Sequence, residues 1–224
     1  FTFDWYIEMW NKARLHQALW NSIKVGVIAS IISTFIALFA AKAFTRYRVK
    51  YSGLSYGAIL LPFIIPEIII AVAFIVIWTS MGLKLGLVPI TISHILYCTP
   101  FCLLILISRM DGFDKSLEEA SMDLGENIFG TFWRVTFPLL LPGIIASLLL
   151  SFVISFDEFI LAFFLSSSDQ TLPIYMWSQL RFPKKLPHVL ALGAIIIVAT
   201  SFIVMLSYWF RNLGQSNNNR GSHI

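Results

Sequence analysis

The chain contains five long stretches with almost no charged side chains, and these stretches limit what it can fold into. They cover residues 25–41, 54–83, 85–108, 135–156 and 189–210, and the only Asp, Glu, Lys or Arg in any of them is Glu67. A helix needs about 20 apolar residues to cross a bilayer, and a backbone in lipid must form its hydrogen bonds within its own segment. We therefore predict an all-α integral membrane protein with five transmembrane helices.

The composition excludes a soluble domain of this length. Charged residues make up 12% of the 224 residues, whereas an average soluble domain carries about 25%. Lipid is the solvent that accounts for this deficit. The net charge of +4 is small and lies mostly in loops, so it indicates orientation in a membrane and not nucleic-acid binding.

Basic residues predict which helix ends face the cytoplasm. The segment between the first two spans contains four basic residues and no acid: Lys42, Arg46, Arg48 and Lys50. By the positive-inside tendency this segment is cytoplasmic, which also places the C-terminus in the cytoplasm. Five spans that begin outside suggest a sixth helix upstream of Phe1. We expect one transmembrane domain over residues 1–215 and a disordered, Asn-rich tail at residues 216–224.

The two cysteines, Cys98 and Cys102, lie one helical turn apart inside an apolar stretch. We expect two packed thiols there, and not a disulfide or a metal site. His94 precedes them in the same span, where a hydrogen-bonded packing role is favoured over a proton relay.

The loop at residues 109–135 is too polar to span a membrane and too regular to be a simple linker. Four residues recur at i, i+3, i+4 and i+7, as on one face of a short helix: Leu117, Ala120, Ser121 and Leu124. Asp114 can cap the start of this helix and Gly125 can end it. A second short helix is expected at residues 127–133, with its large apolar side chains together: Ile128, Phe129, Phe132 and Trp133.

Acids accumulate on this loop: Glu118, Glu119, Asp123 and Glu126. Two interpretations remain open from the pattern. The acids can form a solvated face that the basic segment neutralises, or they can form a docking surface for another protein that supplies basic residues.

The same loop carries a recognisable spacing. The run EAS at 119–121 is followed after three residues by Gly125, and after nine more residues by VTFP at 135–138. This spacing resembles the EAA signature of ABC importer permeases, with mild departures at Ser121, Val135 and Phe137. The resemblance extends over nearly the whole chain, from Trp5 to Phe210.

The resemblance implies a type I ABC importer permease fold with a cytoplasmic coupling helix, in the inner membrane of a bacterial cell. The implied partners are a cytoplasmic ABC ATPase dimer, a second permease subunit and an extracytoplasmic substrate-binding protein. The expected ATPase-coupling residues are Glu118, Glu119, Ala120, Ser121, Asp123 and Gly125. The chain contains no GxxxxGK[ST] element, so we expect no catalytic site and no cofactor on it, with ATP and Mg on the partner ATPase.

Three acids lie in or next to the predicted spans: Glu67, Asp157 and Glu158. Such acids are costly in a membrane and usually face a cavity or a partner. Glu67 follows Pro62 and Pro66, which are expected to kink its helix. A structural glutamate bonded to a neighbouring span remains an alternative for Glu67.

Phe156 and Phe159 frame the other two acids. Carboxylates beside aromatic faces suit an elongated organic cation, because the acids attract ammonium groups and the rings add cation–π attraction. The predicted substrate pathway therefore comprises Glu67, Phe156, Asp157, Glu158 and Phe159. Ordinary interfacial charges remain the alternative for Asp157 and Glu158.

The runs SFDEF at 155–159 and SSSDQTLPIYMWSQLRF at 166–182 narrow the resemblance. They are similar to the second permease subunit of the spermidine/putrescine branch, which implies a polyamine importer with a non-identical companion permease. Permeases for another small solute, such as an opine, iron or thiamine, are the alternative. An ATP-independent transporter would leave the acidic loop without a purpose. A membrane enzyme is disfavoured because the sequence contains no HExxH motif.

The last loop, at residues 165–188, is expected on the outer side. Its apolar run at 172–177 predicts a short interfacial helix. Tyr175 and Trp177 are the expected contacts with a substrate-binding protein, and packing alone is the alternative.

Overall fold

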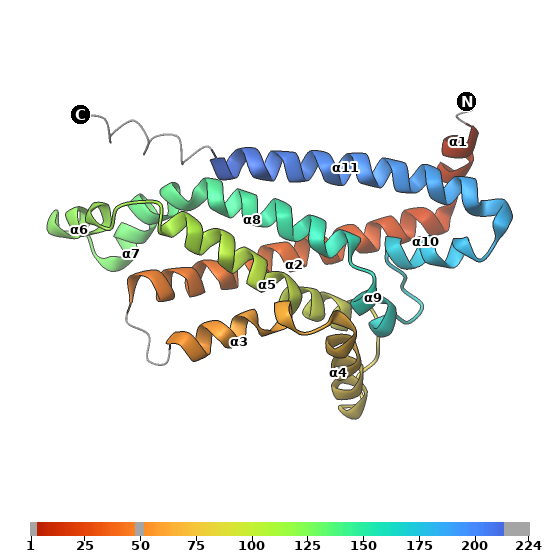
Figure 1. The fold of residues 1–224 in the computed structure, drawn as a ribbon, viewed down its shortest axis with the longest axis horizontal. Coiled ribbons are helices and arrows are strands. Elements are labelled where there is room, and N and C mark those ends of the chain that lie inside the picture. Colours follow the sequence, from red (N-terminus) through yellow and green to blue (C-terminus); the bar gives the residue numbers. More distant parts are fainter. Residues whose placement is uncertain (1–3, 48–51, 213–224) are drawn as a thin grey trace.

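The computed structural model describes residues 4–47 and 52–212, which form helices joined by short connections and contain no strand (Figure 1). The helices are α1 (Asp4–Trp10), α2 (Ala13–Arg46), α3 (Ser52–Ile64), α4 (Glu67–Ser80), α5 (Leu87–Met110), α6 (Ser116–Asp123), α7 (Ile128–Thr131), the π-helical turn η1 (Phe132–Thr136), α8 (Phe137–Asp157), α9 (Ile160–Leu165), α10 (Leu172–Leu180), the 3-10 turn η2 (Pro183–Lys185) and α11 (Leu186–Asn212). The predicted tail at 216–224 and two members of the basic segment, Arg48 and Lys50, lie outside the described residues.

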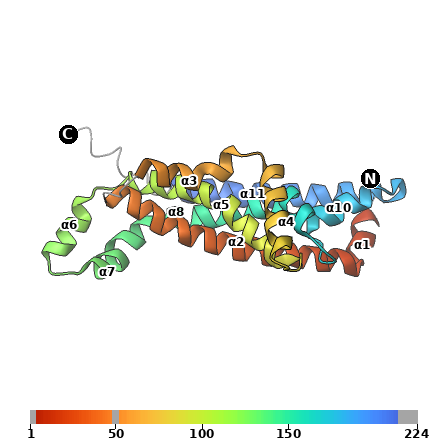
Figure 2. The same ribbon diagram turned by 90° about the horizontal axis from the view of Figure 1, so that it is seen from below.

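Helices α2, α5, α8 and α11 run side by side along the long axis of the molecule (Figures 1 and 2). Helix α2 packs against α5 and α8, and α8 packs against α11. The short helices gather at the two ends, with α6 and α7 at one end and α1 and α10 at the other. The end of α2, the polar loop with α6 and the end of α11 therefore share one end of the bundle, as the predicted topology requires.

Four of the five predicted spans are confirmed as helices long and apolar enough to cross a membrane. They are Ala13–Arg46, Leu87–Met110, Ile128–Asp157 and Pro183–Asn212. The expected short helix at 127–133 is present, but it runs through η1 into α8 and is not separate from the fourth span.

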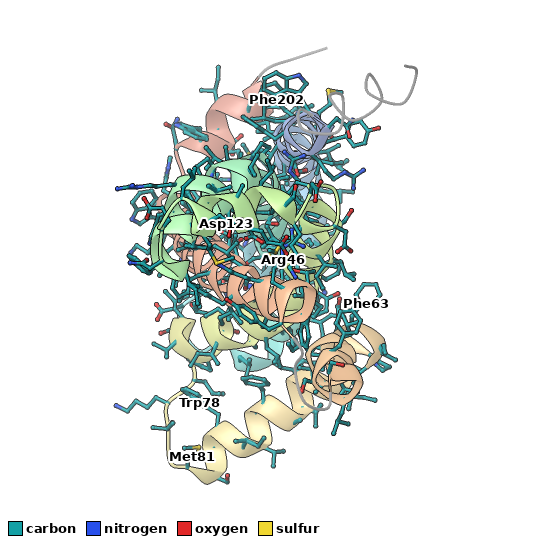
Figure 3. All side chains as sticks on the ribbon, turned by 90° about the vertical axis from the view of Figure 1, so that its left-hand side faces the viewer. Arg46, Phe63, Trp78, Met81, Asp123 and Phe202 are labelled. Carbon is teal, nitrogen blue, oxygen red and sulfur yellow. The ribbon has the colours of Figure 1, made fainter. Side chains whose placement is uncertain are left out.

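The second predicted span is not one helix. Helices α3 and α4 meet at an angle of 101°, a sharper break than the kink that the two prolines predicted. Pro62 is accommodated inside α3. Pro66 has no N–H to continue the ladder and disfavours a helical conformation at Ile65, so the helix ends there. Helix α4 consequently points away from the bundle. Trp78, near the end of α4, and Met81, the residue that follows it, lie far from the long helices (Figure 3).

Polar side chains hold the long helices together inside the apolar bundle. The Ser33 hydroxyl on α2 donates to the carbonyl of Ile95 on α5 at 3.1 Å. The Ser207 hydroxyl on α11 donates to the carbonyl of Ala146 on α8 at 2.9 Å. Cys98 and Cys102 are buried and unoxidised, which confirms the prediction of two packed thiols. The hydrogen bonds of Ser33 and Ser207 hold helices together where the hydrophobic effect cannot, because lipid tails are as apolar as the helix surfaces.

A tight contact joins α5 to α8 near the end that carries α6. The Arg109 guanidinium donates two hydrogen bonds to the carbonyl of Leu139, each at 3.2 Å. The aliphatic part of Arg109 packs directly over Gly143, where an added Cβ would lie 2.9 Å from Cγ of the arginine. Glycine therefore permits the close approach of the two helices at this point.

We predict that Gly143→Ala lowers the thermal unfolding midpoint of the detergent-solubilised protein. The new methyl group displaces Arg109 from the Leu139 carbonyl, and overpacking of this kind costs about 1–3 kcal/mol. Gly57→Ala on α3 is the matched control, because nothing lies within 4 Å of the methyl group it adds. Equal midpoints for Gly143→Ala and Gly57→Ala would contradict the proposed close contact.

Candidate functional site

The predicted start and end of the loop helix are confirmed in α6. A carboxylate oxygen of Asp114 accepts the backbone N–H of Ser116 at 2.9 Å, and this hydrogen bond holds the pKa of Asp114 below its usual value. At the other end Gly125 has a φ of +93°. Its N–H donates to the Met122 carbonyl at 2.9 Å, and the next N–H donates to Ser121 at 3.2 Å. This pair of bonds is a Schellman motif, whose left-handed residue is usually glycine.

Glu118 anchors α6 to the bundle. Its side chain is 6% exposed, and one carboxylate oxygen accepts a hydrogen bond from Nε of Arg46 at 2.6 Å. The Thr136 hydroxyl donates to the other oxygen, and Arg46 also donates to the Met110 carbonyl at 3.2 Å. Glu118, one of the predicted ATPase-coupling residues, is therefore not on the exposed surface of α6, because its carboxylate joins α6 to α2 and η1.

The other loop acids reach the surface. The side chain of Glu119 is 57% exposed and lies 3.6 Å from Lys115. Asp123 is exposed at the same end of the bundle as Arg46 (Figure 3). Glu126 follows α6, is only 28% exposed at its side chain and forms an ion pair with Arg134. The exposed negative charge of α6 is thus concentrated at Glu119 and Asp123.

The apolar face predicted for this helix is not covered by the described part of the chain. Leu117 is 46% exposed and Leu124 is 88% exposed. Ala120 is exposed as well, and the half-buried Ser121 lies 3.2 Å, hydroxyl to hydroxyl, from Thr131. The periodicity of these residues correctly predicts a helix, but the apolar side of α6 points outward and not toward the bundle. An exposed apolar surface with acids beside it is typical of a protein-docking site.

Glu158 is also used inside the chain. Its side chain is 7% exposed and accepts the N–H groups of Leu161 at 2.9 Å and Ala162 at 3.1 Å, which caps α9. His94 on α5 lies 3.2 Å from the same carboxylate and shares a hydrogen bond of 2.7 Å with Ser155. The prediction of Glu158 as a pathway residue is wrong in this arrangement, and the packing role for His94 is confirmed.

Asp157 has the opposite environment to its neighbour. It is exposed at the end of α8 and has no hydrogen bond or ion pair from its carboxylate to the described residues. Glu67 is intermediate, because it is partly exposed at the start of α4 and accepts a hydrogen bond from the Tyr97 hydroxyl. Both acids therefore remain available to a cation.

The two phenylalanines of the predicted pathway also differ. Phe156 is buried in a core cluster with Met9 and Leu172, so the prediction that it faces a pathway is wrong. Phe159 is half-buried, and its ring centroid lies 5.3 Å from that of Phe163.

The short helix predicted at 172–177 is confirmed as α10, but only one of its two predicted contact residues is accessible. Tyr175 is 6% exposed, and burial raises the pKa of its hydroxyl. A direct contact from Tyr175 to a binding protein is therefore excluded in this conformation. Trp177 is 38% exposed, with the Arg181 guanidinium 4.6 Å from its ring centroid.

Known proteins of related sequence are membrane components of transport systems. The family model for "Binding-protein-dependent transport system inner membrane component" matches residues 33–215. The spermidine/putrescine transport system permease protein PotC of Haemophilus influenzae is 30% identical over 208 residues, covering 92% of this chain and 80% of the relative. PotC of Escherichia coli K12 is 31% identical, with 92% and 78% covered. The putrescine transport system permease protein PotI of the same strain is 26% identical, with 92% and 75% covered.

Solved structures confirm the ABC transporter permease fold. A bacterial ABC transporter involved in alginate import aligns with a TM-score of 0.74 and 17% identity, covering 92% of this chain and 79% of that chain. The bacterial alginate ABC transporter in complex with an alginate-bound periplasmic protein aligns with a TM-score of 0.72 and 15% identity, covering 96% and 84%. By sequence and by fold, the chain belongs to the family of binding-protein-dependent transport system inner membrane components.

Proposed function

We propose that this chain is a permease subunit of an ATP-driven importer that moves polyamines such as spermidine and putrescine into the cytoplasm. The relatives named for these substrates support the assignment. The observation that carries it on this chain is Asp157, an exposed carboxylate at the end of α8 with no partner among the described residues. An acid left free at such a position serves a cation or a partner, because an acid at this depth is costly to maintain.

Helix α6 fits a cytoplasmic ABC ATPase dimer as its partner. Its exposed apolar side chains, Leu117, Met122 and Leu124, suit an apolar cleft. Glu119 and Asp123 beside them suit basic residues at the edge of that cleft. ATP and Mg bind to the ATPase in this proposal, and this chain contributes no catalytic group.

The buried network at Glu118 gives α6 a mechanical connection to the bundle. Arg46 belongs to α2, and Thr136 belongs to η1 at the start of α8. A displacement of α6 by the ATPase is thereby transmitted to two long helices at once. Rigid-body movement of packed helices is an established form of switching between two states. This assignment places α6, the basic segment and the C-terminus on the cytoplasmic side of the bacterial inner membrane.

We propose that the substrate pathway is lined by Asp157, Glu67 and the half-buried Phe159. The carboxylates attract the ammonium groups, and aromatic rings add cation–π attraction. A second, non-identical permease subunit closes the pathway from the other side. A substrate-binding protein delivers the polyamine at the outer end, where Trp177 is exposed.

We predict that Glu119→Lys weakens association with the ATPase and abolishes ATP-dependent uptake, without lowering the thermal unfolding midpoint. The change reverses the charge of a side chain that is 57% exposed and holds only an i,i+4 contact with Lys115, and such pairs contribute about 0.3–0.5 kcal/mol. Co-purification of the ATPase and uptake into proteoliposomes are the measurements. Lys115→Gln breaks the same contact and is expected to leave both intact. Loss of the ATPase in Lys115→Gln as well would contradict a specific role for the Glu119 charge.

We predict that Asp157→Asn lowers ATP-dependent uptake of labelled spermidine and putrescine by about tenfold at subsaturating concentration, as expected for one lost hydrogen bond to a charged group. Its thermal unfolding midpoint stays unchanged. Glu158→Gln is expected to lower the midpoint instead, because it weakens the cap of α9 and the contact with His94. If the complex retains its ATPase but the native chain takes up no polyamine, the substrate class is wrong and other solutes must be tested.

A further inference from the structure

An apolar groove lies between the end of α2 and the α7–η1 segment, and the coupling role of α6 does not use it. It encloses about 400 Å³ and is lined by Phe39, Lys42, Ala43, Tyr47, Ile128, Phe129, Phe132 and Trp133. This volume is in the range of roughly 300–1,000 Å³ found for small-molecule sites. Its walls include the aromatic residues that the sequence pattern gathered at 127–133.

Two helices independently place this groove at the depth of the lipid headgroups. The uncharged stretches 25–41 and 135–156 are about 26 and 33 Å long as helices, and each covers most or all of a hydrocarbon core of about 30 Å. The groove residues from Lys42 to Tyr47 follow the first stretch, and those from Ile128 to Trp133 precede the second. Tyrosine and tryptophan at this level are typical of a membrane interface.

The groove continues an exposed apolar stripe on α2. Large apolar side chains recur along one side of this helix at Ile28, Ile31, Phe35 and Phe39, with exposed fractions of 45%, 54%, 62% and 49%. Phe39 is both the last member of the stripe and the first wall of the groove. An acyl chain that lies along the stripe therefore enters the groove without crossing polar surface.

A positive charge is positioned at the groove. The Lys42 ammonium lies 4.5 Å from the ring centroid of Phe132 and has no salt bridge within the described part of the chain. Arg46 is already neutralised by Glu118, so Lys42 is the cation left available at this position. The sequence continues with Arg48 and Lys50, and no acid lies between Lys42 and Lys50. A basic segment directly beside the cytoplasmic membrane surface is typical of anionic-lipid binding.

We infer that this groove binds an anionic phospholipid. Its phosphate pairs with Lys42, and an acyl chain lies along the aromatic walls between α2 and η1. Lipid is favoured over a soluble partner, because the groove lies at headgroup depth and joins the exposed apolar stripe of the transmembrane helix α2. The groove adjoins α6, because Lys42, Tyr47 and Ile128 also line a smaller pocket with Glu118 and Glu119. Its aromatic walls belong to α2, α7 and η1, and not to α6.

The test is lipid retention on the assembled, detergent-purified complex, measured by native mass spectrometry after exposure to phosphatidylglycerol or phosphatidylcholine. We expect preferential retention of phosphatidylglycerol, and about fivefold weaker retention in Lys42→Gln, the effect of one basic residue at an anionic surface. Lys24→Gln is the matched control. Lys24 also lies on α2 over an aromatic ring, 6.0 Å from the centroid of Trp20, but at the opposite end of the helix. Equal retention of the two lipids, or equal effects of the two lysine variants, would overturn the inference.

A second variant tests the apolar wall. Phe129 is 72% exposed, so Phe129→Ala is expected to leave the thermal unfolding midpoint unchanged and to weaken phosphatidylglycerol retention. If the companion permease fills the groove, the assembled complex retains no lipid there and the inference fails. The measurement requires neither polyamine nor ATP, so its outcome is independent of the proposed transport function.

Discussion

A buried carboxylate must be satisfied by other groups of the same chain, and two such carboxylates fix short helices of this protein to its long ones. Glu118 accepts hydrogen bonds from Arg46 and Thr136, and Glu158 accepts two backbone N–H groups at the start of α9. An unpaired buried charge costs several kcal/mol, more than a single contact can recover. The positions of α6 and α9 relative to the long helices are therefore set by where these two acids find donors.

This constraint separates acids that are adjacent in the sequence. Glu118 is buried and bonded, whereas Glu119 is exposed; Glu158 is buried and bonded, whereas Asp157 is exposed. Glu118 and Glu119 are neighbours on α6, where successive residues point about 100° apart. Asp157 is the last residue of α8, whereas Glu158 follows it with extended backbone angles, at the break before α9. The hydrogen bonds of the buried acid, Glu118 or Glu158, fix the position of the backbone around it. Its exposed neighbour, Glu119 or Asp157, is thereby held at a defined position on the surface. The proposed coupling charge at Glu119 and the proposed substrate charge at Asp157 both depend on an inward neighbour.

The parts of this fold that could be predicted from the sequence are those with local causes. Uninterrupted stretches without charged residues predicted the long helices, because a span is defined by one continuous segment of sequence. Asp114 and Gly125 predicted the two ends of α6, because a cap depends on a few neighbouring residues. The sequence analysis did not predict that Glu118 is buried, because its partner Arg46 lies 72 residues away in the sequence. Arg46 stood out in the sequence only as a topological charge. The burial of Phe156 and Tyr175 was missed for a similar reason, since both pack in one cluster with residues of α1, α2 and α11.

The break at Pro66 shows how one local feature produces a site that span counting does not reveal. Because α3 ends at the proline, Glu67 becomes the first residue of a new helix and not the middle of a long one. The N-terminus of a helix carries partial positive charge, so a carboxylate is more stable there than in a helix interior. The Tyr97 hydroxyl on α5 supplies a donor as well. Helix α4 itself is apolar on all sides, and among the described helices it packs mainly against α9 and α5. It therefore requires hydrocarbon or another apolar protein surface around it. The same proline thus directs an apolar helix away from the bundle and leaves an acid at the corner, on the side where a companion subunit and a cationic substrate are proposed to meet.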